Sequence, residues 1–352
     1  MRDLDAPERF AALDPTGMLS CIQDLPAQCE HGYALVHELA LPGALADLDQ
    51  VVILGMGGSA IGGDLLRALL LPECQVPIIV HRDYGLPAYV GARSLVIACS
   101  YSGNTEETLL GFAQAVERKA RVVSVTTGGE LAHRSKALGI PLCEYAYESQ
   151  PRAALGYSLT IPLGILEMAG LVASKAEGVA EAVAVMRDWQ QEINETVPTS
   201  ENAAKLLAQQ LHGHLPVIYG AEHLSEVARR WKGQLNENSK SWGVFDVLPE
   251  LNHNTVVGYG LPAELSELAA VVLLASDLYH QRVRLRLEIT RELLDLEGIR
   301  WHTVEARGQS ALAQMLSVIH FGDYVSYYLA MLHDVDPWSI GNIDFVKRRL
   351  AA

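Results

Sequence analysis

Residues 51–63, VVILGMGGSAIGG, join a short apolar run to a turn made of small residues. The apolar residues at 51–54 predict a buried strand, and the turn after them predicts the entry to a helix near residues 60–70. Residues 95–105, LVIACSYSGNT, repeat this arrangement before a helix near residues 105–119. Backbone amides at two helix starts, with three hydroxyls in the second turn, indicate a receptor for an anion.

The alternation of β-branched runs and amphipathic stretches extends through the first half of the chain. The runs do not alternate between polar and apolar residues, which is typical of parallel strands covered by helices on both faces. We expect strands near residues 51–54, 76–81, 94–99, 121–126 and 140–143. We expect helices near residues 60–70, 105–119 and 129–138.

Residues 157–211 lack a β-rich run and predict a connector of two or three helices. The alternation of strands and helices then restarts. Strands are expected near residues 217–219, 271–274 and 302–304, and helices near residues 223–238, 277–296, 310–332 and 344–350.

Two strand–helix arrays of similar size predict an α/β protein with two doubly wound parallel-sheet domains joined by connector helices. The expected N-terminal domain covers residues 1–155 and begins with a helical lead-in over residues 1–48. The connector covers residues 156–200, and the C-terminal domain covers residues 201–352. A chain of 352 residues is long enough for two domains.

Composition limits the classes of partner. The chain is 49% hydrophobic and 20% charged, which indicates a large core rather than disorder. Its formal net charge of −15 argues against broad binding to nucleic acid, which needs many lysine and arginine contacts to phosphates. A small phosphorylated ligand remains compatible, because a few amides and one or two cations suffice locally.

The chain shows no sign of export or of membrane insertion. Its five cysteines lie in the first half, and none has a CxxC or zinc-like spacing. Residues 1–5 lack the basic flank and apolar core of a signal peptide. No apolar stretch reaches the roughly 20 residues of a membrane helix. We therefore expect a cytoplasmic protein.

The first turn by itself leaves the ligand open. Gly55, Gly57 and Ala60 match the GxGxxA form of the dinucleotide-binding fingerprint, and Asp83 follows the next strand, where it could hold a ribose. A tight strand-to-helix turn without any ligand explains the same glycines.

The second turn favours a phosphate monoester. Ser100, Ser102 and Thr105 supply hydroxyl donors just ahead of a helix, and Asn104 with Glu107 fits a capping box for that helix. Capping alone accounts for one or two polar residues more easily than for three hydroxyls. Donors from two adjacent strand ends can converge on one terminal phosphate, whereas a pyrophosphate is usually held by the amides of a single loop.

These turns resemble the sugar-phosphate loops of sugar isomerase (SIS) domains, which implies flavodoxin-type, SIS-like domains. The matching segments are GMGGSAIGGD at 55–64 and SYSGNTEET at 100–108. The fuller resemblance is to the bifunctional phosphoglucose/phosphomannose isomerases. It rests also on PRAALGYS at 151–158, NENSK at 236–240 and LNHN at 251–254, which occur in the expected order across most of the chain.

The resemblance implies an aldose–ketose isomerase that interconverts glucose 6-phosphate, and also mannose 6-phosphate, with fructose 6-phosphate through an enediolate. It implies neither a metal nor a cofactor. The phosphate would be held by the hydroxyls of Ser59, Ser100, Ser102 and Thr105 and by the amides of Gly57 and Gly58.

The resemblance assigns the proton transfer between C1 and C2 to Glu237, near the end of a helix with a clear apolar stripe. The local sequence equally fits a surface glutamate paired with Lys240. Arg152 is expected to stabilise the enediolate, although most single arginines lie on the surface.

Ring opening would fall to His253, because histidine can move a proton near neutral pH. In the family this histidine comes from the partner chain, which implies a homodimer. Lys347 is a possible catalytic partner, although it equally fits a cation that compensates a helix C-terminus. Trp338 and Ser339 stand where the family commonly carries a Pro-Thr-Pro-like segment. The bulk of Trp338 there puts dual specificity for glucose and mannose in question.

Two other classes of function stay open. The chain could bind a sugar phosphate as an SIS-domain sensor without catalysis, or it could be a dinucleotide-dependent oxidoreductase. The pair His212 and His214 does not lie on a regular helical face, and no carboxylate stands at ligand spacing, so a metal site is not expected there.

Overall fold

The computed structural model describes residues 3–41, 45 and 47–350. It forms two compact units, one of Asp24–Ala184 and the other of Met1–Gln23 with Val185–Ala352. These limits differ from the ranges expected from sequence, because the helical lead-in is divided between the units. Residues 1–2, 42–44 and 46 of that lead-in lie outside the described residues.

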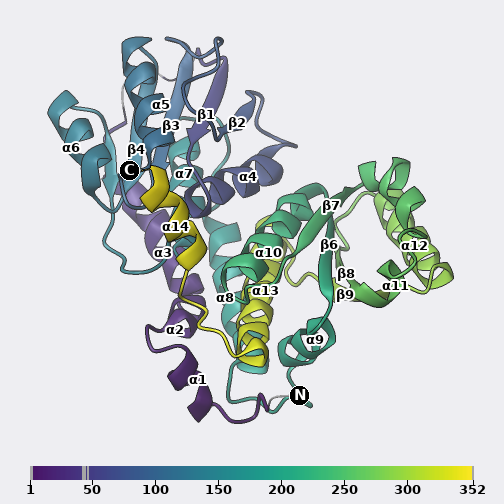
Figure 1. Cartoon of the computed structure of the whole chain (residues 1–352). Coiled ribbons are helices and arrows are strands. Elements are labelled where there is room, and N and C mark those ends of the chain that lie inside the picture. The colour runs from purple at the N-terminus through teal and green to yellow at the C-terminus, as the bar shows by residue number, and fades with distance from the viewer. Residues whose placement is uncertain (1–2, 42–44, 46, 351–352) are drawn as a thin grey trace. The chain divides into compact units, whose positions relative to one another are not determined.

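The first unit contains a five-stranded parallel sheet in the order β2-β1-β3-β4-β5 (Figure 1). The strands are β1 Gln50–Leu54, β2 Ile78–His81, β3 Ser94–Ser100, β4 Arg121–Thr126 and β5 Leu142–Glu144. In register, Val52 of β1 pairs with Ile79 on one side and with Val96 on the other. This is the flavodoxin-like doubly wound order, in which the winding reverses between β1 and β3. In such folds ligands bind outside the carboxyl ends of these two strands, and this region is called the crevice below.

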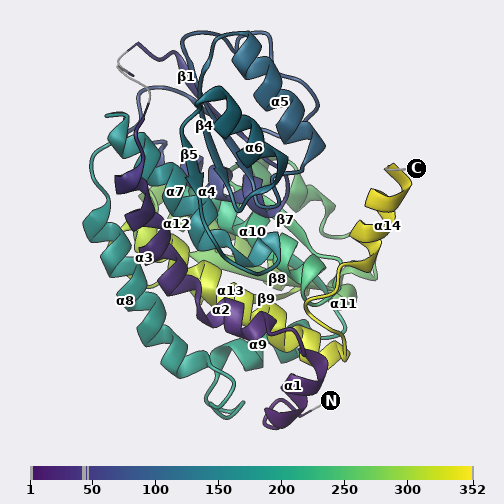
Figure 2. The same ribbon diagram turned by 90° about the vertical axis from the view of Figure 1, so that its left-hand side faces the viewer.

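Helices cover both faces of this sheet. Figure 2 views it from the side of α5 Glu106–Glu117 and α6 Gly129–Leu138. On the opposite face α4 Gly58–Leu70 contacts β2, and α7 Leu155–Met168 packs on α4 and on α3 Leu25–Leu35. Short 3-10 turns are η1 Val36–Glu38 and η2 Pro151–Ala153. Strands β1 and β3 are buried almost throughout, as expected for non-alternating apolar runs covered on both faces.

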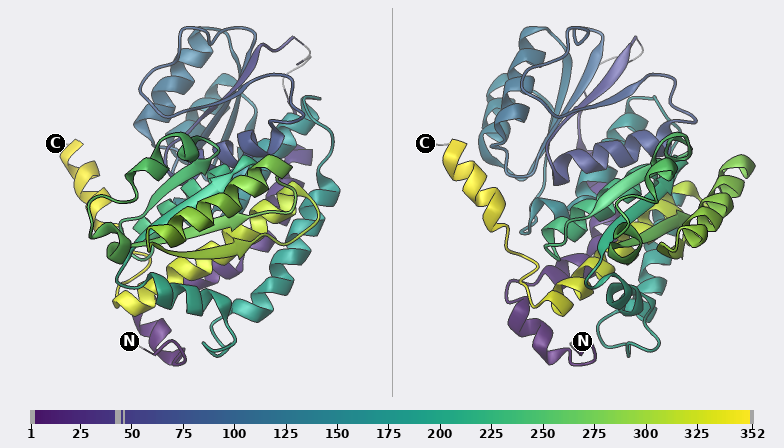
Figure 3. Two further views of the ribbon diagram at one scale, coloured as in Figure 1. Left: turned by 90° about the vertical axis from the view of Figure 1, so that its right-hand side faces the viewer. Right: turned by 45° about the vertical axis from the view of Figure 1, so that its right-hand side comes forward.

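The second unit repeats the winding with four parallel strands in the order β7-β6-β8-β9. The strands are β6 Leu215–Ala221, β7 Val244–Leu248, β8 Ala269–Ala275 and β9 Arg300–Glu305. Figure 1 shows α10 Ser225–Glu237 and α13 Ala311–His333 on one side of this sheet, and Figure 3 shows α12 Gln281–Leu296 across the other. The expected α/β class with two parallel sheets is therefore confirmed.

Further helices complete the chain. They are α1 Glu8–Leu13, α2 Met18–Gln23, α8 Ala176–Ile193, α9 Ala203–Leu211, α11 Leu265–Leu268 and α14 Gly341–Leu350, with the 3-10 turns η3 Glu222–Leu224, η4 Glu250–His253 and η5 Thr255–Gly258. The predicted connector consists of α7, α8 and α9. Strand β7 is absent from the sequence prediction: it is a half-buried edge strand interrupted by Asp246, so it gives no continuous apolar run.

Helix α13 forms the core of the second unit and is buried from Leu312 to Leu332. It contacts α9 and α10, and Gly322 faces Trp231 of α10. A Cβ atom on Gly322 would lie 2.2 Å from the Trp231 indole, whose Nε1 donates to Val318 O at 3.0 Å. Within the described part of the chain, no helix, α13 included, combines the length and hydropathy needed to cross a bilayer.

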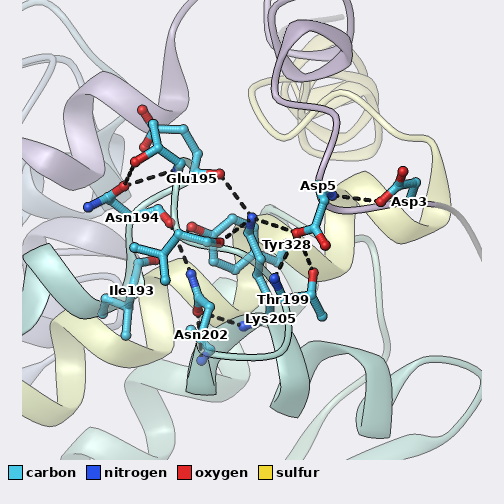
Figure 4. A network of polar contacts seen from close by, with 12 residues as sticks. Asp3, Asp5, Ile193, Asn194, Glu195, Thr199, Asn202, Lys205 and Tyr328 are labelled. Carbon is cyan, nitrogen blue, oxygen red and sulfur yellow. Dashed lines mark hydrogen bonds and ion pairs between the residues drawn. The ribbon is translucent and has the colours of Figure 1, made fainter.

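Hydrogen bonds and an ion pair join the N-terminal residues to α9 and to the loop before it, in the same unit (Figure 4). The buried ammonium of Lys205 on α9 donates to Glu195 O at 2.9 Å and to Val197 O at 2.8 Å, and it lies 3.4 Å from Asp5 Oδ1. Asp5 Oδ1 also accepts from the amide and the hydroxyl of Thr199. Burial lowers the pKa of Lys205, because the ammonium loses its water. The Thr199 bonds hold the pKa of Asp5 below its usual value.

Replacing Lys205 by Met is expected to lower the free energy of unfolding by about 1–3 kcal/mol, because two carbonyls lose their donor while the volume stays filled. Urea unfolding of the whole chain measures it. The matched control is Lys136→Met, which removes a surface pair with Glu144 and should cost under about 1 kcal/mol. Equal stability of the two variants would contradict a structural role for Lys205.

Candidate active site

The crevice between β1 and β3 gathers the residues expected to hold a phosphate. The first loop, residues 55–59, follows β1, and the second loop, residues 100–105, follows β3. Ser59 Oγ accepts a hydrogen bond from the amide of Tyr101 at 3.0 Å, so the two loops are directly joined. Ser59 and the second loop therefore lie side by side, and their convergence on one phosphate stays a prediction.

Serine and threonine hydroxyls in this crevice keep protons that they can donate to a ligand. Ser59 acts as acceptor in its bond to Tyr101, and a hydroxyl that accepts still carries its own proton. Ser100 Oγ and Thr105 Oγ1 lie 3.0 Å apart, so one donates to the other and one proton of the pair remains. Ser102 Oγ accepts from Asn104 N at 3.2 Å and is exposed.

Helix N-termini at the same edge add backbone donors. The N-caps of α4 and α5 are Gly57 and Thr105, and neither makes a side-chain capping bond. The first amides of a helix have no acceptor within the helix, and they carry the positive end of its dipole. In the other unit α9 and α13 meet this need with the side chains of Asn202 and Ser310. The uncapped starts beside Ser59 and Ser100 therefore suit an anion.

The expected capping box of Asn104 and Glu107 is wrong. The N-cap of α5 is Thr105, one residue later. Asn104 Oδ1 accepts instead from the amide of Glu130, at the start of α6, at 3.0 Å. Asn104 therefore joins two neighbouring loops rather than closing its own helix.

A third loop, residues 126–129, belongs to the same crevice and was not predicted. Thr127 donates its amide and its hydroxyl to Tyr101 O, at 3.1 and 2.6 Å. Gly103 has φ +69°, and a Cβ atom there would lie 1.9 Å from Gly128 O, so only glycine fits. The sequence signal was present: TTGG stands between an apolar run and a helix, as in the first two loops.

Arg152 lies on η2 in the same unit as the three loops, and its side chain is buried, with the residue 2% exposed. This burial differs from that of an ordinary surface arginine. Its backbone packs on the first loop: a Cβ atom on Gly58 would lie 2.5 Å from the Pro151 carbonyl and 2.7 Å from Arg152 N. The structure therefore brings Arg152 together with Gly58 and its neighbour Ser59.

Glu237 is the last residue of α10, in the other unit, and is half-buried. The expected apolar stripe is present, with Trp231 and Leu235 buried. Lys240 Nζ donates to the backbone carbonyl of Glu237 at 2.7 Å. Beyond the helix end, Asn238 Nδ2 donates to Ser326 Oγ of α13 at 3.0 Å, which fixes the backbone next to Glu237.

The remaining expected site residues belong to this second unit. His253 ends η4 and is exposed, and Lys347 lies on the exposed helix α14. Trp338 is half-buried and Ser339 is exposed in the turn before α14, where Trp338 N donates to Asp336 Oδ1 at 2.8 Å. The expected site is thus divided between the units, with the phosphate loops and Arg152 in one and these residues with Glu237 in the other.

Among the described residues, no group of three or more histidine, cysteine, aspartate or glutamate side chains is placed to hold a metal ion. His214, one of the two histidines considered from sequence, bonds through Nδ1 to His212 O at 3.1 Å and lies against the guanidinium of Arg300.

Comparisons with known proteins agree with this architecture. A family model described as the bacterial phospho-glucose isomerase C-terminal SIS domain matches residues 200–350. A solved hypothetical protein from Thermus thermophilus shares the fold, with a TM-score of 0.76 and 19% identity over 99% of this chain and 94% of that one. The C-terminal domain of glucosamine-fructose-6-phosphate aminotransferase from Francisella tularensis gives 0.70 and 13%, over 92% and 97%. The chain is an α/β protein of the SIS-domain class.

A closer relative narrows this class. A bifunctional phosphoglucose/phosphomannose isomerase from Caldicellulosiruptor bescii is 42% identical over 337 residues, which cover 95% of this chain and 99% of that protein. The chain belongs to the bifunctional phosphoglucose/phosphomannose isomerase family.

Proposed function

We propose that the chain interconverts fructose 6-phosphate with glucose 6-phosphate, and with mannose 6-phosphate, through an enediolate and without a metal. Family membership supports a sugar-phosphate isomerase. The observation that carries the proposal is the crevice at β1 and β3, where the starts of α4 and α5, without side-chain caps, lie beside the hydroxyls of Ser59, Ser100 and Thr105. Such a crevice suits a terminal phosphate dianion.

The reaction then needs a base, a charge stabiliser and a ring opener. Glu237 takes the proton from C2 of the open-chain aldose, and the C–H electron pair moves toward the C1 oxygen, which gives the enediolate. The proton of the C2 hydroxyl then moves to the C1 oxygen, and Glu237 returns its proton to C1 to give the ketose, so no electron leaves the substrate. The guanidinium of Arg152 offsets the enediolate charge, which a metal would otherwise meet. His253 moves the proton between ring oxygen and anomeric hydroxyl, and Lys347 assists it.

In the reverse direction, reprotonating C2 from either face gives glucose 6-phosphate or mannose 6-phosphate. We propose that Trp338 and Ser339 line the C2 side of the sugar and set the ratio of the two epimers. The half-buried indole and the neighbouring hydroxyl stand directly before α14, the helix that carries Lys347.

The direct test is turnover by the purified chain, with EDTA present, on fructose 6-phosphate. We expect glucose 6-phosphate and mannose 6-phosphate to form, and dialysis against the chelator to leave the rate unchanged. Calorimetric binding of fructose 6-phosphate without turnover would instead make the chain a sugar-phosphate-binding protein. Loss of turnover after chelation, restored by a divalent metal, would overturn metal independence.

We propose that the protein acts in the cytoplasm as a homodimer in which His253 completes the site of the partner subunit. Large apolar side chains of the same unit are exposed near it in sequence: Trp242 at 81%, Val257 at 86% and Leu261 at 80%. Exposed apolar groups of this size are typical of surfaces that become covered in an assembly.

Mixing two inactive variants tests this arrangement. Glu237→Gln and His253→Ala chains, unfolded and refolded together, should regain about a quarter of the wild-type activity, since half of the dimers are mixed and each has one intact site. Each variant refolded alone is the control. A mixture that stays inactive would place both residues of one site on the same chain.

A further inference from the structure

The segment that carries Arg152 has almost no regular structure of its own. Residues 145–154 connect β5 to α7, and η2 is their one short turn. An arginine side chain has many rotamers, and catalysis loses rate when a group is misplaced by about 1 Å. Contacts that immobilise this segment therefore affect the position of the Arg152 guanidinium, and through it the rate.

Tyr101 of the second loop holds the segment on its N-terminal side. Its hydroxyl donates to Tyr147 O at 2.5 Å and accepts from Ser149 N at 2.8 Å. The backbone of the same residue donates to Ser59 Oγ and accepts from Thr127. Tyr101 thus ties the segment, through its side chain, to the loops that face the phosphate.

Gln28 of α3 holds the segment on the other side of Arg152. It is fully buried, and its Nε2 donates to Ala153 O at 2.9 Å and to the Tyr147 hydroxyl at 2.8 Å. Its Oε1 accepts from Gly156 N at 3.2 Å. The carbonyl directly after Arg152 is therefore bonded to a side chain in a helix of the same unit.

We propose that Tyr101 and Gln28 are positioning residues for Arg152: their side chains clamp residues 147–156 from both sides and hold the guanidinium where it meets the enediolate. This inference rests on the proposed isomerase function. It goes beyond that function because neither residue is expected to contact the substrate. Glycine at position 58 completes the arrangement by letting the Pro151–Arg152 backbone pack on the first loop.

The primary test is Tyr101→Phe, which removes only the hydroxyl. We expect kcat to fall by about tenfold to a hundredfold. The KM for fructose 6-phosphate and the inhibition constant of inorganic phosphate should stay within about twofold, because the bond from the Tyr101 amide to Ser59 is made by backbone and persists. Gln28→Met should act in the same direction. Tyr89→Phe, at a tyrosine that is 54% exposed, is the matched control and should be silent.

A double-mutant cycle distinguishes an effect of Tyr101 on the position of Arg152 from a general destabilisation of the site. In an Arg152→Met background, Tyr101→Phe should lower kcat no further, because the group that it positions is gone. A full tenfold loss in that background, or an unchanged kcat in Tyr101→Phe alone, would overturn the inference.

Amide hydrogen exchange gives a readout that does not depend on turnover. Residues 147–153 should exchange faster in Tyr101→Phe than in Tyr89→Phe, while α4 and α5 stay unchanged. If the wild type does not isomerise fructose 6-phosphate, the proposed function fails, and with it the role assigned to Arg152. Unchanged exchange with an active wild type would refute the clamp alone.

Discussion

Glu237→Gln is expected to abolish isomerisation, with kcat reduced by about a thousandfold or more, because an amide of the same shape cannot accept the proton from C1 of the ketose or C2 of the aldose. Phosphate affinity should be retained, since the phosphate loops belong to the other unit. Two measurements check this: the steady-state rate on fructose 6-phosphate, and the incorporation of solvent deuterium at C1 and C2. Both should be lost together.

Glu264→Gln is the control for this prediction, because Glu264 is an exposed glutamate of the same unit. It should keep wild-type kcat and exchange. Wild-type-like turnover in Glu237→Gln would show that another group is the base. Loss of inorganic-phosphate binding in that variant would show that the substitution disturbs more than proton transfer.

Gly58→Ala is expected to lower kcat/KM by about a hundredfold or more, because the added methyl meets backbone rather than a movable side chain. A Cβ atom at this position would lie 2.5 Å from the carbonyl of Pro151 and 2.7 Å from Arg152 N. Either the first loop or the η2 turn must move, so phosphate affinity and kcat should both suffer. Phosphate inhibition and turnover, measured on the same preparation, distinguish this joint loss from the kcat-only loss expected for Tyr101→Phe.

Gly91→Ala is the matched control, because a Cβ atom there meets nothing within 4 Å. It should be active and stable. If Gly58→Ala binds phosphate and turns over as the wild type does, the close approach of η2 to the first loop is not required for the site. Thermal unfolding of both variants shows whether any loss comes from the site or from global destabilisation.

Most of the fold was accessible from local pattern. The runs that became β1 and β3 are apolar without alternation because both faces of the sheet are covered, and that pattern is written in consecutive residues. The same pattern did not predict β7, because an edge strand with Asp246 in its middle has no continuous apolar run. The capping box failed because Asn104 and Glu107 fit the motif, whereas Asn104 bonds to the start of a different helix.

For the site too, local sequence pattern predicted some residues, and the rest depended on tertiary contacts. The hydroxyls of Ser100 and Thr105 were identified from the local sequence, because they stand between a recognisable strand and a helix, whereas Ser59 was named through the family resemblance. The third loop carries the same signal in TTGG, but its part in the crevice depends on β4 lying beside β3.

The small-residue turns, the non-alternating strands and the family motifs are local properties, so consecutive residues were enough to predict two parallel sheets and a phosphate site. The strand order 2-1-3-4-5, the burial of Arg152 and the bonds from Tyr101 and Gln28 to the segment around it are different. They join residues separated by about fifty to more than a hundred positions, and only packing decides which distant backbone a side chain reaches. Tertiary structure therefore decides that the two turns lie together and that the buried Arg152 lies beside them.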